Sequence, residues 1–133
     1  MAGRLAYVDT SAFVKLVLGE DEADALRAEL ERWEGHVSSR LLRTEAIRAC
    51  ARYGRPYARL AAEASSTLAL LPLDEAVLDA AAALEPAELR TLDALHLATA
   101  LSLGRDLGAI LVYDARLAEG ARLAGLAVLA PGA

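Results

Sequence analysis

The feature that most constrains the fold of this chain is an alternation of short apolar segments with longer stretches of helical period. Four apolar segments are candidate strands, at Leu5–Val8, Leu70–Leu73, Ala109–Tyr113 and Ala127–Leu129, and His36–Ser38 could be a further short strand. Amphipathic stretches lie between them and predict helices, at Thr10–Leu18, Glu20–Glu34, Leu41–Tyr53, Tyr57–Leu68, Glu75–Leu84, Thr91–Leu103 and Ala115–Ala124. Strands that alternate with helices in this way predict an α/β fold with a parallel sheet.

The composition indicates a helix-rich globular protein. The chain has 133 residues, of which 56% are hydrophobic, and we expect one domain over residues 1–133. No uncharged stretch exceeds eleven residues, whereas a helix that spans a membrane needs ~20. The N-terminus lacks the apolar segment of a signal peptide, and the single cysteine, Cys50, lies among small residues at helical spacing. We therefore expect a cytoplasmic location and no contact with membranes.

Basic residues are concentrated in one part of a chain whose net charge is −5. Between residues 40 and 59 there are six arginines and one acid, Glu45; the arginines are Arg40, Arg43, Arg48, Arg52, Arg55 and Arg59. We call these six residues the arginine stripe. Its spacing fits a solvated helix face, and it also fits a surface that binds phosphates.

Two acids come directly after predicted strands. Asp9 follows Leu5–Val8, and Asp114 follows Ala109–Tyr113. In an open parallel sheet, binding sites form beyond the carboxyl ends of the strands, so the two acids could converge there. Each could instead be a helix N-cap, a position that aspartate fills well.

Two further acids lie inside predicted helices. Asp93 interrupts the stretch "TLDALHLATALSLG", which is otherwise apolar or small, and a buried carboxylate is costly unless it is paired or bound to a cation. It also lies in the first turn, where it could cap the helix near Thr91 or interact with the helix dipole. Glu45 has Arg48 three residues further on, so an ordinary surface ion pair is an alternative for it.

Taken together, these residues resemble the PIN-domain family, and more narrowly the VapC toxins of bacterial toxin–antitoxin pairs. The resemblance covers essentially the whole chain and rests on four ordered motifs: "VDTSAFVKL", Glu45 on a helix, "LRTLDALHLATAL" and "VYDARLAEGARLAGL". It implies a three-layer α/β/α fold with a short central parallel sheet flanked by helices. Two positions depart from the family's pattern: Val112 stands where a threonine or serine is often found, and Leu117 stands where some members have an extra acid.

The resemblance also implies a site and an activity. Its catalytic acids carry over onto Asp9, Glu45, Asp93 and Asp114, with Ser11 as a supporting polar residue. We expect Asp9, Asp93 and Asp114 to bind Mg²⁺ or Mn²⁺, because oxygen ligands select hard cations. The implied protein is a metal-dependent endoribonuclease, commonly a homodimer, with a VapB-like antitoxin as its partner. We expect Arg40, Arg48 and Arg52 to contact the RNA.

Two other functions fit parts of the pattern. A receiver-like phosphoacceptor domain also gathers acids at strand ends, but it needs a lysine near a late strand, and Lys15 is the only lysine here. A binding module could keep the fold without catalysis. His96 lies one turn after Asp93, and we interpret it as a buried supporting residue rather than a metal ligand or a base.

The only phenylalanine and the only tryptophan are candidates for binding the antitoxin. Phe13 and Trp33 occur on neighbouring predicted helices, and aromatic side chains in a groove commonly anchor a partner helix. A cationic side chain of that partner could then reach the acids. The alternative is that such apolar stripes simply fill the core.

Overall fold

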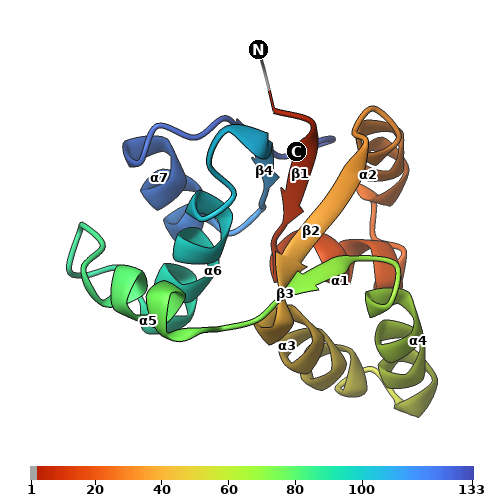
Figure 1. Ribbon diagram of the computed structural model, residues 1–133. Coiled ribbons are helices and arrows are strands. Elements are labelled where there is room, and N and C mark those ends of the chain that lie inside the picture. The colour runs from red at the N-terminus through yellow and green to blue at the C-terminus, as the bar shows by residue number, and fades with distance from the viewer. Residues whose placement is uncertain (1–2) are drawn as a thin grey trace.

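The protein contains a five-stranded parallel sheet in the order β3-β2-β1-β4-β5 (Figure 1). This computed structural model describes residues 3–133. The strands are β1 (Leu5–Val8), β2 (Gly35–Ser39), β3 (Ala69–Leu71), β4 (Leu107–Leu111) and β5 (Val128–Leu129). Every pair of neighbouring strands is parallel, which confirms the α/β class expected from the alternating pattern.

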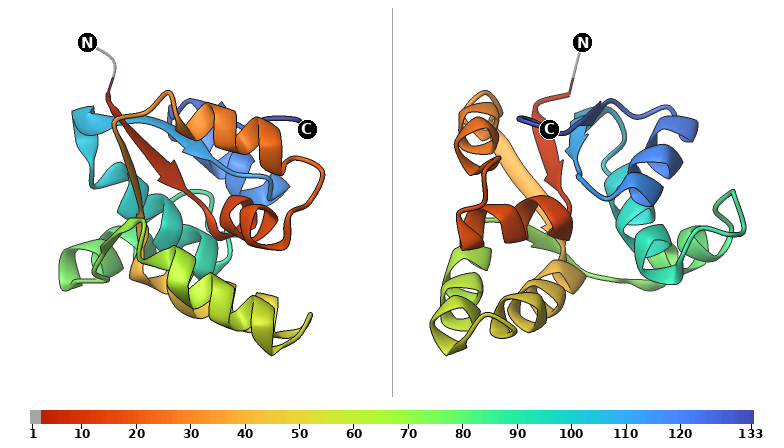
Figure 2. Two further views of the ribbon diagram at one scale, coloured as in Figure 1. Left: turned by 90° about the vertical axis from the view of Figure 1, so that its right-hand side faces the viewer. Right: turned by 180° about the vertical axis from the view of Figure 1, so that it is seen from behind.

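Helices cover both faces of the sheet and complete three layers (Figures 1 and 2). One face carries four helices, which are α1 (Thr10–Leu18), α2 (Ala23–Leu30), α3 (Arg40–Ala51) and α4 (Arg55–Ser65). The other face carries three, which are α5 (Glu75–Ala82), α6 (Thr91–Leu101) and α7 (Ala115–Leu123), and a short 3₁₀ helix, η1 (Gly104–Asp106), precedes β4. The three-layer α/β/α fold is therefore confirmed.

The alternating side chains of β1 show why the sheet has two apolar faces. Ala6 and Val8 belong to a core cluster with residues of α1 to α4. Tyr7, between them, belongs to a second cluster formed with α6 and α7. Because successive side chains of a strand point to opposite faces, one four-residue strand contributes to both cores.

The strand order places a topological switch point at the carboxyl end of β1. From β1 the chain moves outward to β2 and β3, and it then returns to pair β4 with the other side of β1. The connections after β1 and β4 therefore leave toward opposite faces, to α1 and α7 (Figure 1). Open α/β sheets bind their ligands at such a switch point.

The element boundaries differ from the expected ones where turns and side chains intervene. The helix expected over 20–34 is shorter, because Gly19 adopts a left-handed conformation and the Glu20 amide still bonds to Lys15 of α1. The helix α4 begins before its expected start, since Pro56 is tolerated in a first helical turn. The expected strand at 109–113 ends two residues early, because the Tyr113 amide bonds to a side chain rather than to the sheet.

Among the described residues, no helix has both the length and the apolar character needed to cross a membrane.

Candidate active site

Asp9 is the most buried acid of the site, and its position follows from the start of α1. Its backbone amide bonds to the Leu111 carbonyl of β4 (2.9 Å), so the residue continues the β1 ladder. Its side chain is the N-cap of α1, and Oδ2 accepts bonds from the Ser11 amide (3.1 Å) and hydroxyl (2.6 Å). The expected capping role is thus real, but it occupies only one oxygen of a carboxylate that is 4% exposed.

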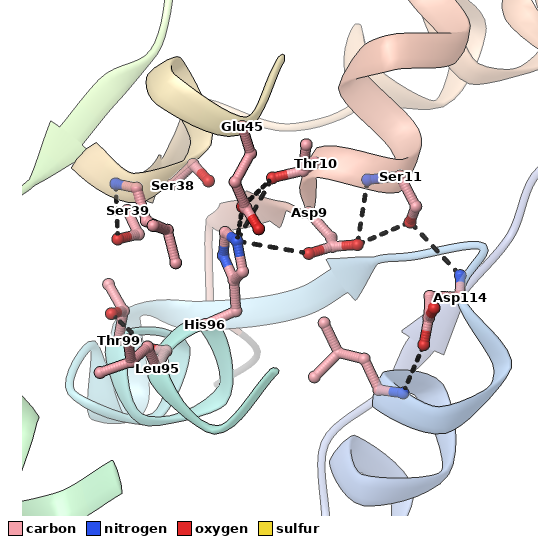
Figure 3. A network of polar contacts seen from close by, with 12 residues as sticks. Asp9, Thr10, Ser11, Ser38, Ser39, Glu45, Leu95, His96, Thr99 and Asp114 are labelled. Carbon is pink, nitrogen blue, oxygen red and sulfur yellow. Dashed lines mark hydrogen bonds and ion pairs between the residues drawn. The ribbon is translucent and has the colours of Figure 1, made fainter. Parts of the chain in front are cut away.

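Ser11 joins the ends of β1 and β4. Its hydroxyl donates to Asp9 and accepts bonds from the amides of Tyr113 (2.9 Å) and Asp114 (3.3 Å). The two acids at the strand ends are therefore tied to a single hydroxyl (Figure 3). Asp114 is exposed, and its Oδ1 caps α7 by accepting from the Leu117 amide (2.9 Å).

Glu45 does not form the surface pair with Arg48 that its spacing allowed. Its Oε1 lies 2.6 Å from Nε2 of His96 and accepts a 2.7 Å hydrogen bond from the Thr10 hydroxyl. Figure 3 shows His96 between Glu45 and Asp9, whose Oδ1 is 3.8 Å from Nε2. Glu45 of α3, Thr10 of α1 and His96 of α6 thus meet although they are distant in sequence.

The pKa values of Glu45 and His96 are consistent with an ion pair. Burial opposes the charge of each group, but hydrogen bonding to His96 and the charge of the imidazole lower the pKa of Glu45. Burial likewise disfavours the His96 cation, yet the bond to Glu45 and the negative charges of Asp9, Glu45 and Asp93 raise its pKa. The protein therefore supplies a counter-charge for Glu45.

Asp93 has a different environment. It is half-buried in the first turn of α6, and it makes no hydrogen bond or ion pair within residues 3–133; the α6 N-terminus has no side-chain cap. The capping alternative is therefore not observed. Burial, followed by the negative charges of Asp114 and Asp9, raises the pKa of its carboxyl group, so Asp93 lies close to the other two acids.

The donor set fits a hard divalent cation in its chemistry. It consists of carboxylates at one end of the sheet, and Asp93, which forms no ion pair among the described residues, lies near two other acids. Within the described residues, no three potential metal ligands are grouped closely enough to enclose an ion. Asp114 is turned toward α7 and Glu45 toward His96, so binding requires a reorientation of side chains.

Some members of this site are not expected from the sequence. The sequence pattern marks Thr10 only as a helix residue, and it marks Tyr7, whose hydroxyl lies 2.7 Å from Nδ1 of His96, only as part of a strand. A polar side chain inside an otherwise buried strand is the one signal that points to Tyr7. The two departures from the family pattern, Val112 and Leu117, are buried core residues.

The arginines proposed to bind RNA are exposed. Arg40, Arg48 and Arg52 are on or directly after α3, and within residues 3–133 none of them forms an ion pair. Arg40 and Arg43 also line a groove of about 810 Å³ between the start of α3 and the end of α4, whose other lining residues are Leu41, Thr44, Ala62, Ser65, Ser66, Leu68, Leu70 and Leu73. Among the described residues, no acid lines this groove.

The two aromatic residues expected to bind a partner lie in different environments. Phe13 is 3% exposed and is part of the core cluster on the α1 to α4 face. Its expected role as a surface anchor is therefore wrong, because its ring fills the core. Trp33 is half-buried, and it packs close to Gly108, at the amino-terminal edge of the sheet. The acids Asp9 and Asp114 lie at the other end of the strands, after the carboxyl ends of β1 and β4.

Lys15 does not occupy the position that a receiver-like site requires. Its ammonium group pairs with Glu22 (3.1 Å) and Glu20 (3.6 Å) and lies 5.0 Å from the centre of the Tyr113 ring. Its ion pairs are therefore with glutamates before α2 and not with the four acids of the site.

Comparisons with known proteins agree with this geometry. The family model described as "PIN domain" matches residues 6–123. The chain is 48% identical over 125 residues to Ribonuclease VapC46 of Mycobacterium tuberculosis (strain ATCC 25618 / H37Rv), covering 94% of this chain and 96% of the relative. It is 41% identical over 134 residues to Ribonuclease VapC47 of M. tuberculosis (strain CDC 1551 / Oshkosh), covering 97% and 98%. The chain therefore belongs to the PIN-domain family.

Proposed function

We propose that this protein is a metal-dependent endoribonuclease and the toxin of a VapBC-type toxin–antitoxin pair. The observation that carries the proposal is that the Ser11 hydroxyl joins Asp9 and Asp114 at the ends of the neighbouring strands β1 and β4, and that Asp93 on α6 lies close enough for both charges to raise its pKa. Two relatives that are named as VapC ribonucleases support it, because this chain matches each of them over nearly its full length. We also propose that residues 1–133 form one domain.

Asp9, Asp93 and Asp114 would hold Mg²⁺ or Mn²⁺, with Glu45 beside them. The bound cation would activate a water and neutralise charge on the phosphate. Ser11 keeps Asp9 Oδ2 in place, so Oδ1 is the oxygen directed to the site. Glu45 has one oxygen bound by Thr10 and His96, and Oε2 orients the attacking water and accepts its proton.

The RNA would approach along α3. Arg40, Arg48 and Arg52 are on or directly after the helix that also carries Glu45, and phosphate contacts by arginine supply affinity without sequence preference. Arg40 occupies the first turn of α3, where the helix dipole disfavours a cation. An anionic ligand would remove that cost, and the groove with Arg43 offers space for one.

A VapB-like antitoxin would restrain this activity. Trp33 remains the candidate anchor, with part of its surface accessible and its indole N–H bound to Glu29 (2.9 Å). Because Trp33 and the acids are at opposite edges of the sheet, the antitoxin must extend along the α1 and α2 face to place a cationic side chain in the site. Trp33→Ala should weaken its binding in calorimetry without changing RNA cleavage by the free toxin.

We further propose that the protein acts in the cytoplasm, where it would meet both RNA and a co-produced antitoxin. A homodimer is also part of the proposal, and light scattering of the purified chain tests it directly.

RNA cleavage by the purified chain tests the function. Total RNA should be degraded with millimolar Mg²⁺ or Mn²⁺ and should remain intact with a chelator, and readdition of the metal should restore cleavage. Asp79→Asn, at an exposed position of α5, serves as a control and should cleave as the parent does. A folded chain that leaves every RNA intact with either metal would instead be a non-catalytic binding module.

A further inference from the structure

His96 is the polar exception in a buried stretch of α6. It is 2% exposed, and its neighbours Leu97, Ala98 and Ala100 are core residues. Both ring nitrogens nevertheless have partners, Nδ1 at 2.7 Å from the Tyr7 hydroxyl and Nε2 at 2.6 Å from Glu45 Oε1. The ring therefore connects the sheet to the acid on α3 through the interior of the protein.

The identity of the ring's partners indicates which nitrogen carries a proton when Glu45 is ionised. An ionised carboxylate has no hydrogen to donate, so the short distance to Glu45 requires a hydrogen on Nε2. Tyr7 satisfies Nδ1 in either protonation state of the ring, because its hydroxyl can donate or accept. Thr10 donates a second bond to the same Glu45 oxygen. Two donors from α1 and α6 thus hold Oε1, and Oε2 has no hydrogen bond among the described residues.

We propose that His96 is a positioning residue, which with Thr10 holds Glu45 Oε1 so that only Oε2 faces the acid site. Tyr7 fixes the ring plane from the sheet. In this arrangement Glu45 orients water and does not bind the metal directly. The catalytic consequence rests on the proposed ribonuclease function, whereas the hydrogen-bonded arrangement does not.

A purely structural role explains the arrangement less well. An apolar side chain of similar volume would fill the space between β1 and α6 at no cost for burying charge, and such replacements of buried pairs are often neutral or stabilising. The trio of Tyr7, His96 and Glu45 instead keeps polar groups in a buried place. In the part of the chain that is described, no buried side-chain nitrogen or oxygen lacks a hydrogen-bond partner, and this includes the buried atoms of the trio.

Two substitutions of His96 separate positioning from packing. The amide nitrogen of His96→Gln reaches the place of Nε2 and can still donate to Glu45, whereas that of His96→Asn reaches only the place of Nδ1. We expect His96→Gln to keep kcat within about fivefold of the parent, and His96→Asn to lose on the order of 10²-fold. The KM for RNA and the Mg²⁺ dissociation constant, measured by calorimetry, should change by less than about twofold in both.

Equal losses of kcat in the two variants, or a loss confined to KM, would overturn the proposal. So would a large change in Mg²⁺ affinity in His96→Asn, because it would make Glu45 a metal ligand. If neither variant folds, Thr10→Val removes the other donor to Oε1, and it should lower kcat while KM stays constant. An unchanged kcat in a folded Thr10→Val would then count against the proposal.

Nuclear magnetic resonance of the metal-free parent tests the geometry without RNA. The proton on His96 Nε2 should resonate far downfield and exchange slowly, because it is buried and bonded to a carboxylate. Glu45→Gln should shift this signal upfield, whereas Tyr7→Phe should leave it in place. A His96 Nε2 that carries no proton in the folded parent would overturn the positioning role, whether or not the protein cleaves RNA.

Discussion

Glu45 and Asp93 enter the same site from opposite faces of the sheet, on α3 and α6, and their surroundings shift their pKa values in opposite directions. His96 and Thr10 lower the pKa of Glu45 by bonding to its charged form. Burial and the neighbouring acids Asp114 and Asp9 raise the pKa of Asp93. The protein supplies the first carboxylate with a hydrogen-bonded cation, whereas the second has no ion pair among the described residues and is influenced more by its neighbouring acids than by Arg90 and His96.

This difference separates two roles that the sequence does not distinguish. A carboxylate that already has a cationic partner is held in position and gains little from a metal ion. A carboxylate without an ion pair, whose nearby acids outweigh its nearby cations, lowers the stability of the folded chain until a cation binds there. We therefore propose that Asp93 binds the metal with Asp9 and Asp114, and that Glu45 positions the water.

The largest expected effect is the loss of cleavage when a metal ligand is replaced. Asp93→Asn and Asp9→Asn should each reduce RNA cleavage by at least about 10³-fold, since both remove charge from the cation site. A cleavage assay on total RNA measures this, with Asp79→Asn as the control. If Asp93→Asn cleaved RNA at the parental rate, Asp93 would not be a metal ligand.

Stability of the metal-free chain should respond to Glu45 and Asp93 with opposite signs. Glu45→Gln should lower the free energy of unfolding by about 1 kcal/mol, because it replaces a partly buried hydrogen bond between charged groups with a neutral one. Asp93→Asn should raise that free energy, since a folded carboxyl group with a raised pKa opposes folding once it is ionised. Urea denaturation at neutral pH measures both.

Glu63→Gln, at an exposed position of α4, is the matched control and should leave the unfolding free energy unchanged. If Asp93→Asn and Glu45→Gln destabilised the protein equally, the contrast between the two acids would be wrong.

A smaller effect is expected at the arginine stripe. Replacing Arg48 and Arg52 with alanine should weaken RNA binding and reduce the slope of log K against log salt by about one for each phosphate that an arginine no longer neutralises. Fluorescence anisotropy over a range of salt concentrations measures the slope. Arg105→Ala, on η1, is the control. Identical slopes for the double variant and the parent would leave the stripe as a solvated helix face.

The smallest effect concerns pH. His96 has a raised pKa, so its contribution to stability is complete below its ordinary value of 6.5 and is lost as pH rises through the folded value. Glu45 has a lowered pKa, so its contribution is complete above 4.5 and is lost as pH falls through the folded value. The pair should therefore stabilise the metal-free chain most between these two values.

Urea denaturation from pH 4 to 9 tests this dependence, with His96→Gln as the comparison. The difference in unfolding free energy between parent and variant should be greatest between pH 4.5 and 6.5. A difference that does not vary with pH would show that the pair is not ionic.

The fold could be predicted from the sequence because its signals are local. Apolar segments such as Leu5–Val8 and amphipathic stretches such as Thr10–Leu18 carry their periodicity in neighbouring residues, and both elements are confirmed with those bounds. The predicted ends of elements were wrong where a residue distant in sequence determines them, as at Tyr113, whose amide bonds to the Ser11 hydroxyl.

The acids of the site could be selected from the sequence because a charge stands out in an apolar pattern. Their partners could not, since His96 and Glu45 are 51 residues apart in the chain and meet only when α3 and α6 pack on the sheet. Spacing alone favours Arg48 as the partner of Glu45, but that arginine is exposed to solvent. Phe13 shows a different error. As the only phenylalanine it is expected from the sequence to anchor a partner, but its ring is part of the core.

The central claim, that the acids at the end of β1 form a cation site, is tested most directly by thermal unfolding with and without metal. On this proposal Mg²⁺ binds the folded state and not the unfolded one, so it should raise the melting temperature of the parent, with a gain of about 2.7 kcal/mol at a hundredfold excess over its dissociation constant. Asp93→Asn should show little or no rise. A parental melting temperature that does not change with millimolar Mg²⁺ or Mn²⁺ would contradict the claim.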